Sequence, residues 1–330
     1  MTKPDVVLNP AGLVRRLPLK PEELQSTIIA QRDMFVLAHI GIPQVDISTW
    51  TLDVGGEVAT PLRLTYEELR RFPKHTVESF HQCAGFPRRP DLPTRRVVNV
   101  VWGGAPVCDV AAAAGVKPNA HYLWAYGLDR GPFEGKPDHY AKDLPLQRLH
   151  DGSWLLAYEV NGEPLTPEHG FPVRLVAPGF YGTNCVKWIS RIAFSEQRCP
   201  GTFTQVLYND PVKGSDERRP VWEAGPESVI VAPHDRAQLA PGHHKVWGWA
   251  WGSKPITRVE VSCDGGATWG EARLESRRQW SWQRFSFAWD AREPRQTELR
   301  ARAIDADARV QPERDARNAI HCIDVTIAPA

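Results

Sequence analysis

The chain has 330 residues, more than one domain of ordinary size contains, and this length suits two domains. Apolar residues make up 42% of it and charged residues 24%, a composition that excludes disordered and fibrous proteins. Forty basic side chains against thirty-nine acidic ones leave a net charge of +1, which gives no reason to expect nucleic acid or a membrane surface as partner.

The N-terminal residues 1–30 are predicted to be an extension ahead of the first domain. They contain no apolar core behind a basic end, so no secretory signal is visible and we expect a cytoplasmic protein; the alternative is a periplasmic protein whose signal was removed. No apolar run of the chain approaches the ~18 residues that a membrane-spanning helix needs.

Residues 31–215 are predicted to form a mixed α+β domain. Thr65 is a helix N-cap candidate followed by acidic residues, and a second helix is predicted over Val107–Ala114, ended by Gly115. Because strands and short helices do not alternate regularly, the pattern favours α+β over a doubly wound sheet. The strand-like runs are 47–54, 97–102, 121–126, 154–160, 173–176 and 189–194.

Residues 221–330 are predicted to form an all-β sandwich. Trp247, Trp249 and Trp251 alternate with small residues, the period-2 pattern of a strand, and a hairpin turn is predicted at 264–266. Eight of the thirteen tryptophans lie in the last third of the chain, more than one small core easily hides. Since aromatic residues are favoured at interfaces, this surplus predicts a two-fold homodimer.

The cysteines give one candidate for chemistry. All six are widely spaced and no C-x-x-C occurs, which excludes a zinc ribbon and a c-type haem attachment site. Cys83 differs from the others because Arg88 and Arg89 follow it, and a positive field favours the thiolate that ligates metals. The alternative is a buried structural cysteine in a loop whose arginines face solvent.

A second cluster of polar residues lies further along the chain. His169-Gly170 leads to Arg174, and a glycine-rich stretch then leads to Cys185-Val186-Lys187-Trp188. Glycines let the backbone approach a ligand closely, and Arg, Lys and His side chains hold phosphate or heterocycle oxygens. The alternative for His169 is a structural cap in its Gly-Pro turn.

Taken together and in this order, the two clusters resemble the sulfite oxidase family of molybdenum enzymes. Cys83-Ala84-Gly85 stands at the family's C-A-G-N-R-R, and Trp102 stands before the corresponding helix. Residues 169–174 and 185–188 stand at H-G-x-P-x-R and S-V-K-W, and the C-terminal third resembles the family's immunoglobulin-like dimerisation domain. The resemblance covers about residues 30–330.

This resemblance implies a molybdopterin-binding domain over 31–215, and a protein thiolate on molybdenum, Cys83. It implies that the pterin is held by Phe35, His39, Asp129, His169, Arg174, Cys185, Val186 and Lys187. Tyr208, Arg88 and Trp102 match active-site positions. The implied reaction is oxygen-atom transfer from sulfite to sulfate. Since the chain carries no haem motif, the electrons are expected to pass to an external acceptor whose identity is open.

The substrate site departs from the family pattern. Leu37 stands where the family has an arginine, Phe86 and Pro87 replace Asn and Arg, and the loop after Pro312 is shortened, with a spacing that does not support Arg317 as a substitute for its arginine. Each missing cation weakens an anion site by ~1–3 kcal/mol. The alternatives are therefore a molybdenum enzyme acting on another S- or N-oxide, and a non-catalytic scaffold.

Overall fold

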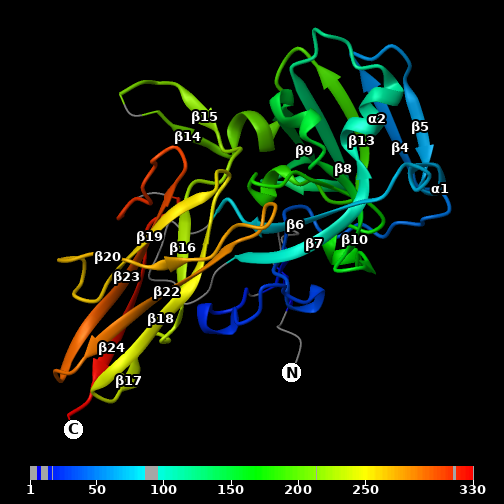
Figure 1. The fold of residues 1–330 in the computed structure, drawn as a ribbon. Coiled ribbons are helices and arrows are strands. Elements are labelled where there is room, and N and C mark those ends of the chain that lie inside the picture. The colour runs from blue at the N-terminus through cyan, green and yellow to red at the C-terminus, as the bar shows by residue number, and fades with distance from the viewer. Residues whose placement is uncertain are drawn as a thin grey trace. The chain divides into compact units, whose positions relative to one another are not determined.

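The protein, seen as a computed structural model, is described over residues 6–8, 14–16, 18–85, 96–212, 214–314 and 317–329. The chain forms two compact units, and neither is contiguous in sequence. The first unit comprises Met1–Leu17, Ala30–Val77 and Val100–Trp222, and the second comprises Pro18–Ile29, Glu78–Asn99 and Glu223–Ala330. The sequence placed residues 78–99 in the first domain, whereas the second unit groups Glu78–Asn99 with the C-terminal strands, which are drawn from yellow to red in Figure 1.

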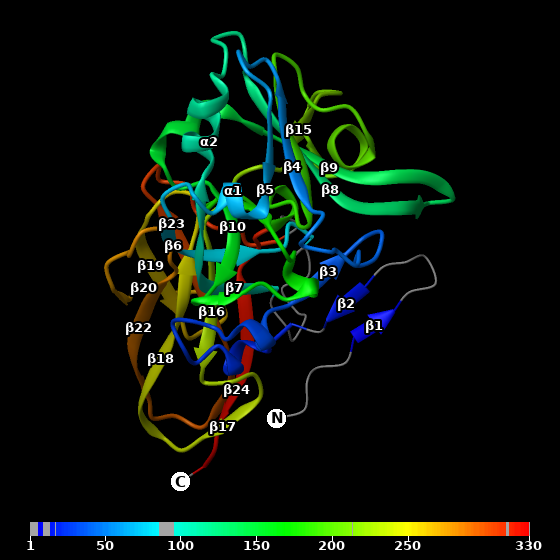
Figure 2. The ribbon, with the colours of Figure 1, turned by 90° about the vertical axis from the view of Figure 1, so that its right-hand side faces the viewer.

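The larger sheet of the first unit has the strand order β5-β4-β13-β8-β9. Only β13 and β4 run parallel, and β8 and β9 form a long hairpin (Figure 2). One face buries apolar side chains such as Leu52, Leu123 and Ile192 in the main core. The strands are β4 (Thr51–Gly56), β5 (Leu62–Thr65), β8 (Tyr122–Phe133), β9 (Lys136–Pro145) and β13 (Ile189–Ser195).

A second sheet has the order β11-β10-β7-β6, with β12 also paired to β10. Strands β7 and β10 approach closely at Gly104, where a Cβ atom would lie 2.2 Å from the Leu156 carbonyl oxygen, so only glycine fits. The strands are β6 (His75–Gln82), β7 (Val97–Pro106), β10 (Leu155–Val160), β11 (Glu163–Pro164) and β12 (Arg174–Val176).

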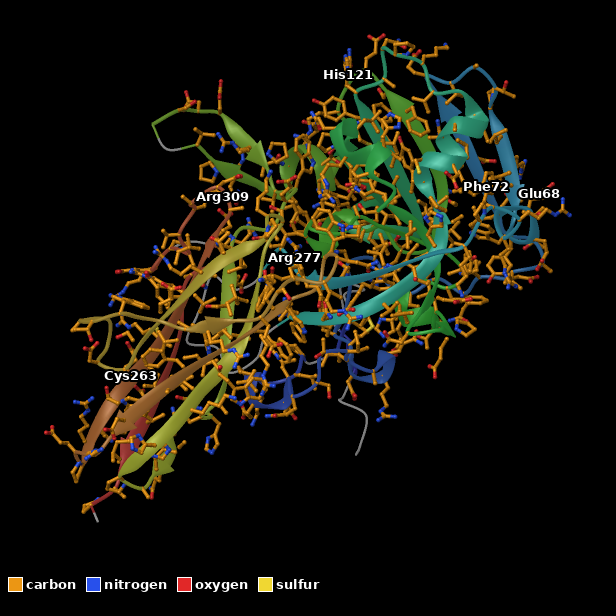
Figure 3. The ribbon with its side chains drawn as sticks, viewed as in Figure 1. Glu68, Phe72, His121, Cys263, Arg277 and Arg309 are labelled. Atoms are coloured by element: carbon orange, nitrogen blue, oxygen red, sulfur yellow. The ribbon has the colours of Figure 1, made fainter. Side chains whose placement is uncertain are left out.

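Both predicted helices are confirmed, α1 over Tyr66–Leu69 and α2 over Val107–Ala114. The Thr65 hydroxyl accepts from the Glu68 N–H at 3.3 Å, and the Glu68 carboxylate accepts from the Thr65 N–H at 2.8 Å, which forms a capping box (Figure 3 labels Glu68). Gly115 ends α2 with φ 65°, a conformation that favours glycine. Among the described residues, no helix is both long and apolar enough to cross a membrane.

The strand predicted from Ile47 begins only at Thr51. The Asp46 carboxylate accepts from the Ser48 N–H at 2.9 Å and from the Ser48 hydroxyl at 2.7 Å, so residues 46–49 form a turn instead. The remaining elements of this unit are short: β1 (Val6–Leu8), β2 (Val14–Arg16), β3 (Val36–Ala38), β14 (Asn209–Pro211), β15 (Arg218–Pro220), η2 (Gln31–Asp33), η3 (Leu146–Asp151), η4 (Pro167–His169), η5 (Gly182–Asn184) and the π-helical turn η6 (Thr202–Val206).

The second unit contains the predicted β-sandwich. Its sheets have the orders β16-β18-β22-β21 and β17-β24-β23-β19-β20, and they bury a shared core that includes Val246, Phe285 and Leu299. The turn after β19 places Gly265 and Gly266 at φ 72° and 96°, with Cys263 just before it (Figure 3). The elements are η1 (Pro21–Glu23), β16 (Glu227–Ala232), β17 (Ala237–Leu239), β18 (Gly242–Trp251), β19 (Ile256–Ser262), β20 (Gly270–Glu271), β21 (Arg273–Leu274), β22 (Gln283–Ala291), β23 (Arg295–Asp305) and β24 (His321–Ile327).

The alternating tryptophans of β18 do not fill the sandwich core. Val246 and Ala250 face that core, so the tryptophans of β18 lie on its other side. The Trp249 indole donates to the Leu24 carbonyl oxygen at 2.7 Å, and the Trp251 indole donates to the Gln82 side-chain oxygen at 2.9 Å. These bonds fasten the segments 18–29 and 78–85 to β18, which explains why both belong to the second unit.

Candidate functional site

The residues predicted over 169–188 come together in the first unit. Gly170 follows η4 with φ 108°, and a Cβ atom there would lie 3.1 Å from the Arg174 Cβ and 3.2 Å from the Lys187 Cβ. A side chain at Gly170 would therefore separate the two cations or strain the turn. The glycine lets Arg174 and Lys187 lie side by side.

Arg174 is the buried cation of this group, with 3% of its surface exposed. Its guanidinium donates to the His169 carbonyl oxygen at 3.1 Å and to the Cys185 carbonyl oxygen at 3.2 Å. It also lies 4.8 Å from the centroid of the Trp102 ring, which is itself fully buried in β7. Burial lowers the pKa of Arg174 to about 10.

The charges of Lys187 and Asp129 attract each other in this group. Burial and the charge of Arg174 lower the pKa of Lys187 to about 7, while Asp129 opposes the shift. Burial raises the pKa of Asp129 to about 6 against the attraction of Lys187. The Lys187 ammonium donates to the Glu168 carbonyl oxygen at 3.0 Å. Among the described residues, none donates a hydrogen bond to the buried Asp129 Oδ1.

His169, Cys185 and Val186 frame this group mainly through the backbone. The His169 imidazole is buried with its Nε2 3.1 Å from the Gln31 carbonyl oxygen. The Cys185 sulfur accepts from the Ala177 N–H at 3.4 Å, and burial raises the pKa of its thiol. Both interpretations of His169, cofactor contact and structural cap in its Gly-Pro turn, stay predictions.

His39 and Tyr208 meet in the same unit, although 169 residues separate them. The Tyr208 hydroxyl lies 2.7 Å from the His39 Nε2. The imidazole is stacked on the Tyr140 ring, with centroids 5.5 Å apart and planes at 22°. Phe35 is half-buried just before β3, and Leu37 is half-buried within it.

Cys83 lies in the second unit, directly after β6. Its thiol group is buried, with 6% of the residue exposed, and its N–H donates to the Arg96 carbonyl oxygen at 2.9 Å. The Arg317 guanidinium donates to the carbonyl oxygen of Ala84, the next residue. Spacing along the chain gave no sign of this contact, because it joins residues 233 positions apart. Arg88 lies outside the described residues.

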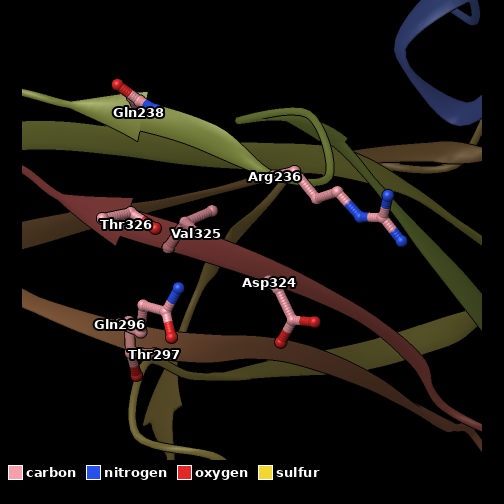
Figure 4. A pocket seen from close by; sticks show the side chains of 7 residues that line it. All are labelled: Arg236, Gln238, Gln296, Thr297, Asp324, Val325 and Thr326. Atoms are coloured by element: carbon pink, nitrogen blue, oxygen red, sulfur yellow. The ribbon is translucent and has the colours of Figure 1, made fainter.

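A polar depression on the second unit lies over β17, β24 and β23 (Figure 4). Its lining includes Arg236, Gln238, Gln296, Thr297, Asp324 and Thr326. The Arg236 side chain is 88% exposed there. Among the described residues, no group of three or more His, Cys, Asp or Glu side chains is placed to hold a metal ion, here or elsewhere.

Comparison with known proteins matches both parts of the chain to described families. Residues 39–203 match the oxidoreductase molybdopterin binding domain, and residues 218–325 match the Mo-co oxidoreductase dimerisation domain. Sulfite oxidase of Gallus gallus is 33% identical, over 94% of this chain and 72% of that protein. Mitochondrial sulfite oxidase of Rattus norvegicus is 31% identical over 94% of this chain, which spans only 63% of the rat protein.

Among solved structures, the sulfane dehydrogenase SoxCD from Paracoccus pantotrophus superimposes with a TM-score of 0.82 at 27% identity. The match covers 98% of this chain and 89% of the SoxCD chain. Both domain matches, the identity to sulfite oxidases and the shared fold agree. The chain therefore belongs to the sulfite oxidase family of molybdopterin-binding oxidoreductases.

Proposed function

We propose that this chain is a molybdenum-dependent oxidoreductase that converts sulfite to sulfate and passes the electrons to an external acceptor. Its family and the activity named for its relatives support this proposal. The observation that carries it is a group of three ionisable side chains, Arg174, Lys187 and Asp129. The buried Oδ1 of Asp129 accepts no hydrogen bond from the described residues and so offers an acceptor to a ligand.

The residues of this group fit molybdopterin. Its phosphate needs cationic donors, which Arg174 and Lys187 supply, and an anion there would offset the burial and the repulsion by Arg174 that together lower the pKa of Lys187. Its pterin ring carries N–H groups, and Asp129 Oδ1 offers them an acceptor. Backbone groups of His169, Cys185 and Val186, and the segment from Phe35 to His39, would complete the binding surface.

When bound, the molybdenum cofactor supplies a two-electron centre for oxygen-atom transfer. In this proposal Cys83 provides the protein thiolate, since a soft sulfur ligand suits a thiophilic metal. Tyr208 orients an oxygen of the substrate, and Arg88 attracts the substrate anion. Trp102 packs against Arg174 and so fixes the guanidinium that binds the cofactor. The family's dimerisation domain supports a homodimer of this chain.

A second candidate substrate is a sulfane sulfur compound, since SoxCD is named a sulfane dehydrogenase. The observation that favours it is Leu37, an apolar side chain in β3 where the family's segment has a cation. A site with fewer cations binds the sulfite dianion weakly, and an apolar wall suits a less charged substrate.

The test is the molybdenum content of the purified protein together with dye reduction dependent on sulfite. Stoichiometric molybdenum with sulfite-dependent reduction at a high KM is the expected result. A fully loaded protein that ignores sulfite but reduces the dye with a sulfane substrate would replace the first candidate with the second. Failure to bind molybdenum at all would leave only the non-catalytic scaffold.

A further inference from the structure

A buried lysine lies beneath the ring of Tyr208, and the proposed function has not used it. Lys142, in β9, is 1% exposed, and its ammonium is 5.1 Å from the centroid of the Tyr208 ring. The ammonium donates to the carbonyl oxygen of Phe203 at 2.8 Å, within the turn η6 that leads to Tyr208. Burying an ammonium group costs free energy, so the surrounding residues must stabilise Lys142 in this position.

The charges around Lys142 do not neutralise it directly. Its neighbour Asp143 is already bound by Arg198, whose guanidinium donates to the two carboxylate oxygens at 2.9 and 3.1 Å. Asp143 also accepts from the N–H of Cys199 at 3.0 Å. Burial lowers the pKa of Lys142 to about 8; Asp143 and Cys199 oppose this shift, and Arg198 adds to it.

Tyr208 is held at its other end as well. Its hydroxyl lies 2.7 Å from His39 Nε2, and its backbone has φ 56°, a left-handed conformation that a tyrosine adopts only when its surroundings enforce it. His39 is in turn packed against the rings of Tyr140 and Phe203, 5.5 and 5.2 Å away. The phenol is thus fixed at its oxygen by an imidazole and at its ring face by a cation.

We propose that Lys142 and His39 are positioning residues for the Tyr208 hydroxyl. With Nε2 protonated, His39 donates to the phenol oxygen, so the phenol proton points away from the imidazole and toward a substrate oxygen. The Lys142 charge fixes the ring by a cation–π contact and makes the phenol more acidic, hence a better donor. This inference rests on the proposed function, because Tyr208 is the group through which both residues act.

The experiment uses full-length, molybdenum-loaded protein labelled with 3-fluorotyrosine, and Tyr208→Phe identifies the Tyr208 fluorine signal. In Lys142→Met we expect a loss of roughly tenfold in kcat/KM below pH 8, where Lys142 carries its charge. Lys142→Arg, which keeps the positive charge, should restore most of kcat/KM. Lys136→Met is the matched control, because Lys136 lies on the same strand with an exposed side chain.

Two further measurements separate positioning from a purely structural effect. Wild-type protein should show an inflection of the Tyr208 signal near the pKa of Lys142, absent in Lys142→Met, and this needs no turnover. His39→Gln, which keeps an N–H donor, should retain more kcat/KM than His39→Leu. Additive kcat/KM losses for Lys142→Met and Tyr208→Phe, or an inflection near the Lys142 pKa that persists in Lys142→Met, would overturn the proposal, whatever substrate the enzyme turns over.

Discussion

At the scale of single residues, the molecule holds ionisable groups in places that disfavour their charged forms. Lys187 has its pKa lowered toward 7 and Asp129 has its pKa raised toward 6, both chiefly by burial. A pair arranged in this way is costly for the protein alone and becomes favourable when a ligand supplies the missing charge and hydrogen bonds. The group is therefore better explained by ligand binding than by stability.

The low pKa of Lys187 predicts a pH dependence of cofactor retention. An anionic phosphate favours the ammonium form, so binding takes up a proton above pH 7 and weakens as pH rises, by up to about tenfold per pH unit. The measurement is the rate of pterin release at pH 6.5, 8 and 9, monitored through the fluorescence of the oxidised pterin. Lys187→Met should release the pterin faster and with little pH dependence. A wild-type rate that does not change over this range would contradict the prediction.

The cysteines allow a second test at this scale. Cys83→Ser replaces a thiolate by a largely protonated hydroxyl, a poor ligand for molybdenum. We expect a loss of at least ~100-fold in turnover, the usual cost of removing a key catalytic group. Cys108→Ser, Cys199→Ser, Cys263→Ser and Cys322→Ser serve as controls and should retain turnover per folded enzyme. Equal behaviour of all five variants would show that Cys83 is not the ligand.

At the scale of elements, strand β18 packs on both of its faces. Its Val246 and Ala250 side chains enter the sandwich core, and its tryptophans bind segments that are distant in sequence. Trp249 also stacks on Trp282, with centroids 4.7 Å apart and planes at 8°. The Trp282 indole in turn donates to the Thr27 carbonyl oxygen at 3.0 Å.

Trp249→Leu should loosen the N-terminal segment. The change removes the stacked ring and the bond to the Leu24 carbonyl oxygen, at a cost of about 1–3 kcal/mol in the free energy of unfolding. Amide hydrogen exchange should accelerate over residues 18–29 before it does in the sandwich strands. Trp269→Leu, a change at a half-exposed tryptophan of the same unit, is the control. Unchanged exchange over 18–29 would show that other contacts hold this segment.

Local signals in the sequence were enough to predict the helices and most strands. The cap at Thr65, the glycine after Ala114 and the alternation in β18 each act within a few residues of the chain. The placement of residues 78–99 could not be predicted in this way, since the Trp251–Gln82 bond spans 169 residues. The burial of Lys142 could not be predicted either, because a lone lysine beside an aspartate has the sequence pattern of a solvent-exposed pair.

At the scale of the whole molecule, part of the aromatic surplus has a different use from the one predicted. Trp249, Trp251 and Trp282 are at most 4% exposed, buried within the second unit. These three therefore do not supply an interface, and the proposed homodimer depends on the half-exposed tryptophans and on the match to the dimerisation domain.

Sedimentation equilibrium of the full chain at micromolar concentration tests the dimer. We expect a species of twice the 37.1 kDa chain mass. A dissociation that is insensitive to salt would agree with an interface dominated by apolar contacts. A single species at the chain mass over the whole concentration range would leave the protein a monomer.

The interleaved boundaries of the two units restrict how this protein can be divided. A break after Trp222 would leave Glu223–Ala330 without Pro18–Ile29 and Glu78–Asn99, and would bare the indoles that those segments cover. Gene fusion or recombination at that point transfers an incomplete module with an exposed aromatic face, prone to aggregation. An exchangeable unit must instead carry its two N-terminal segments with it, so the C-terminal strands are inherited together with the loop that bears Cys83.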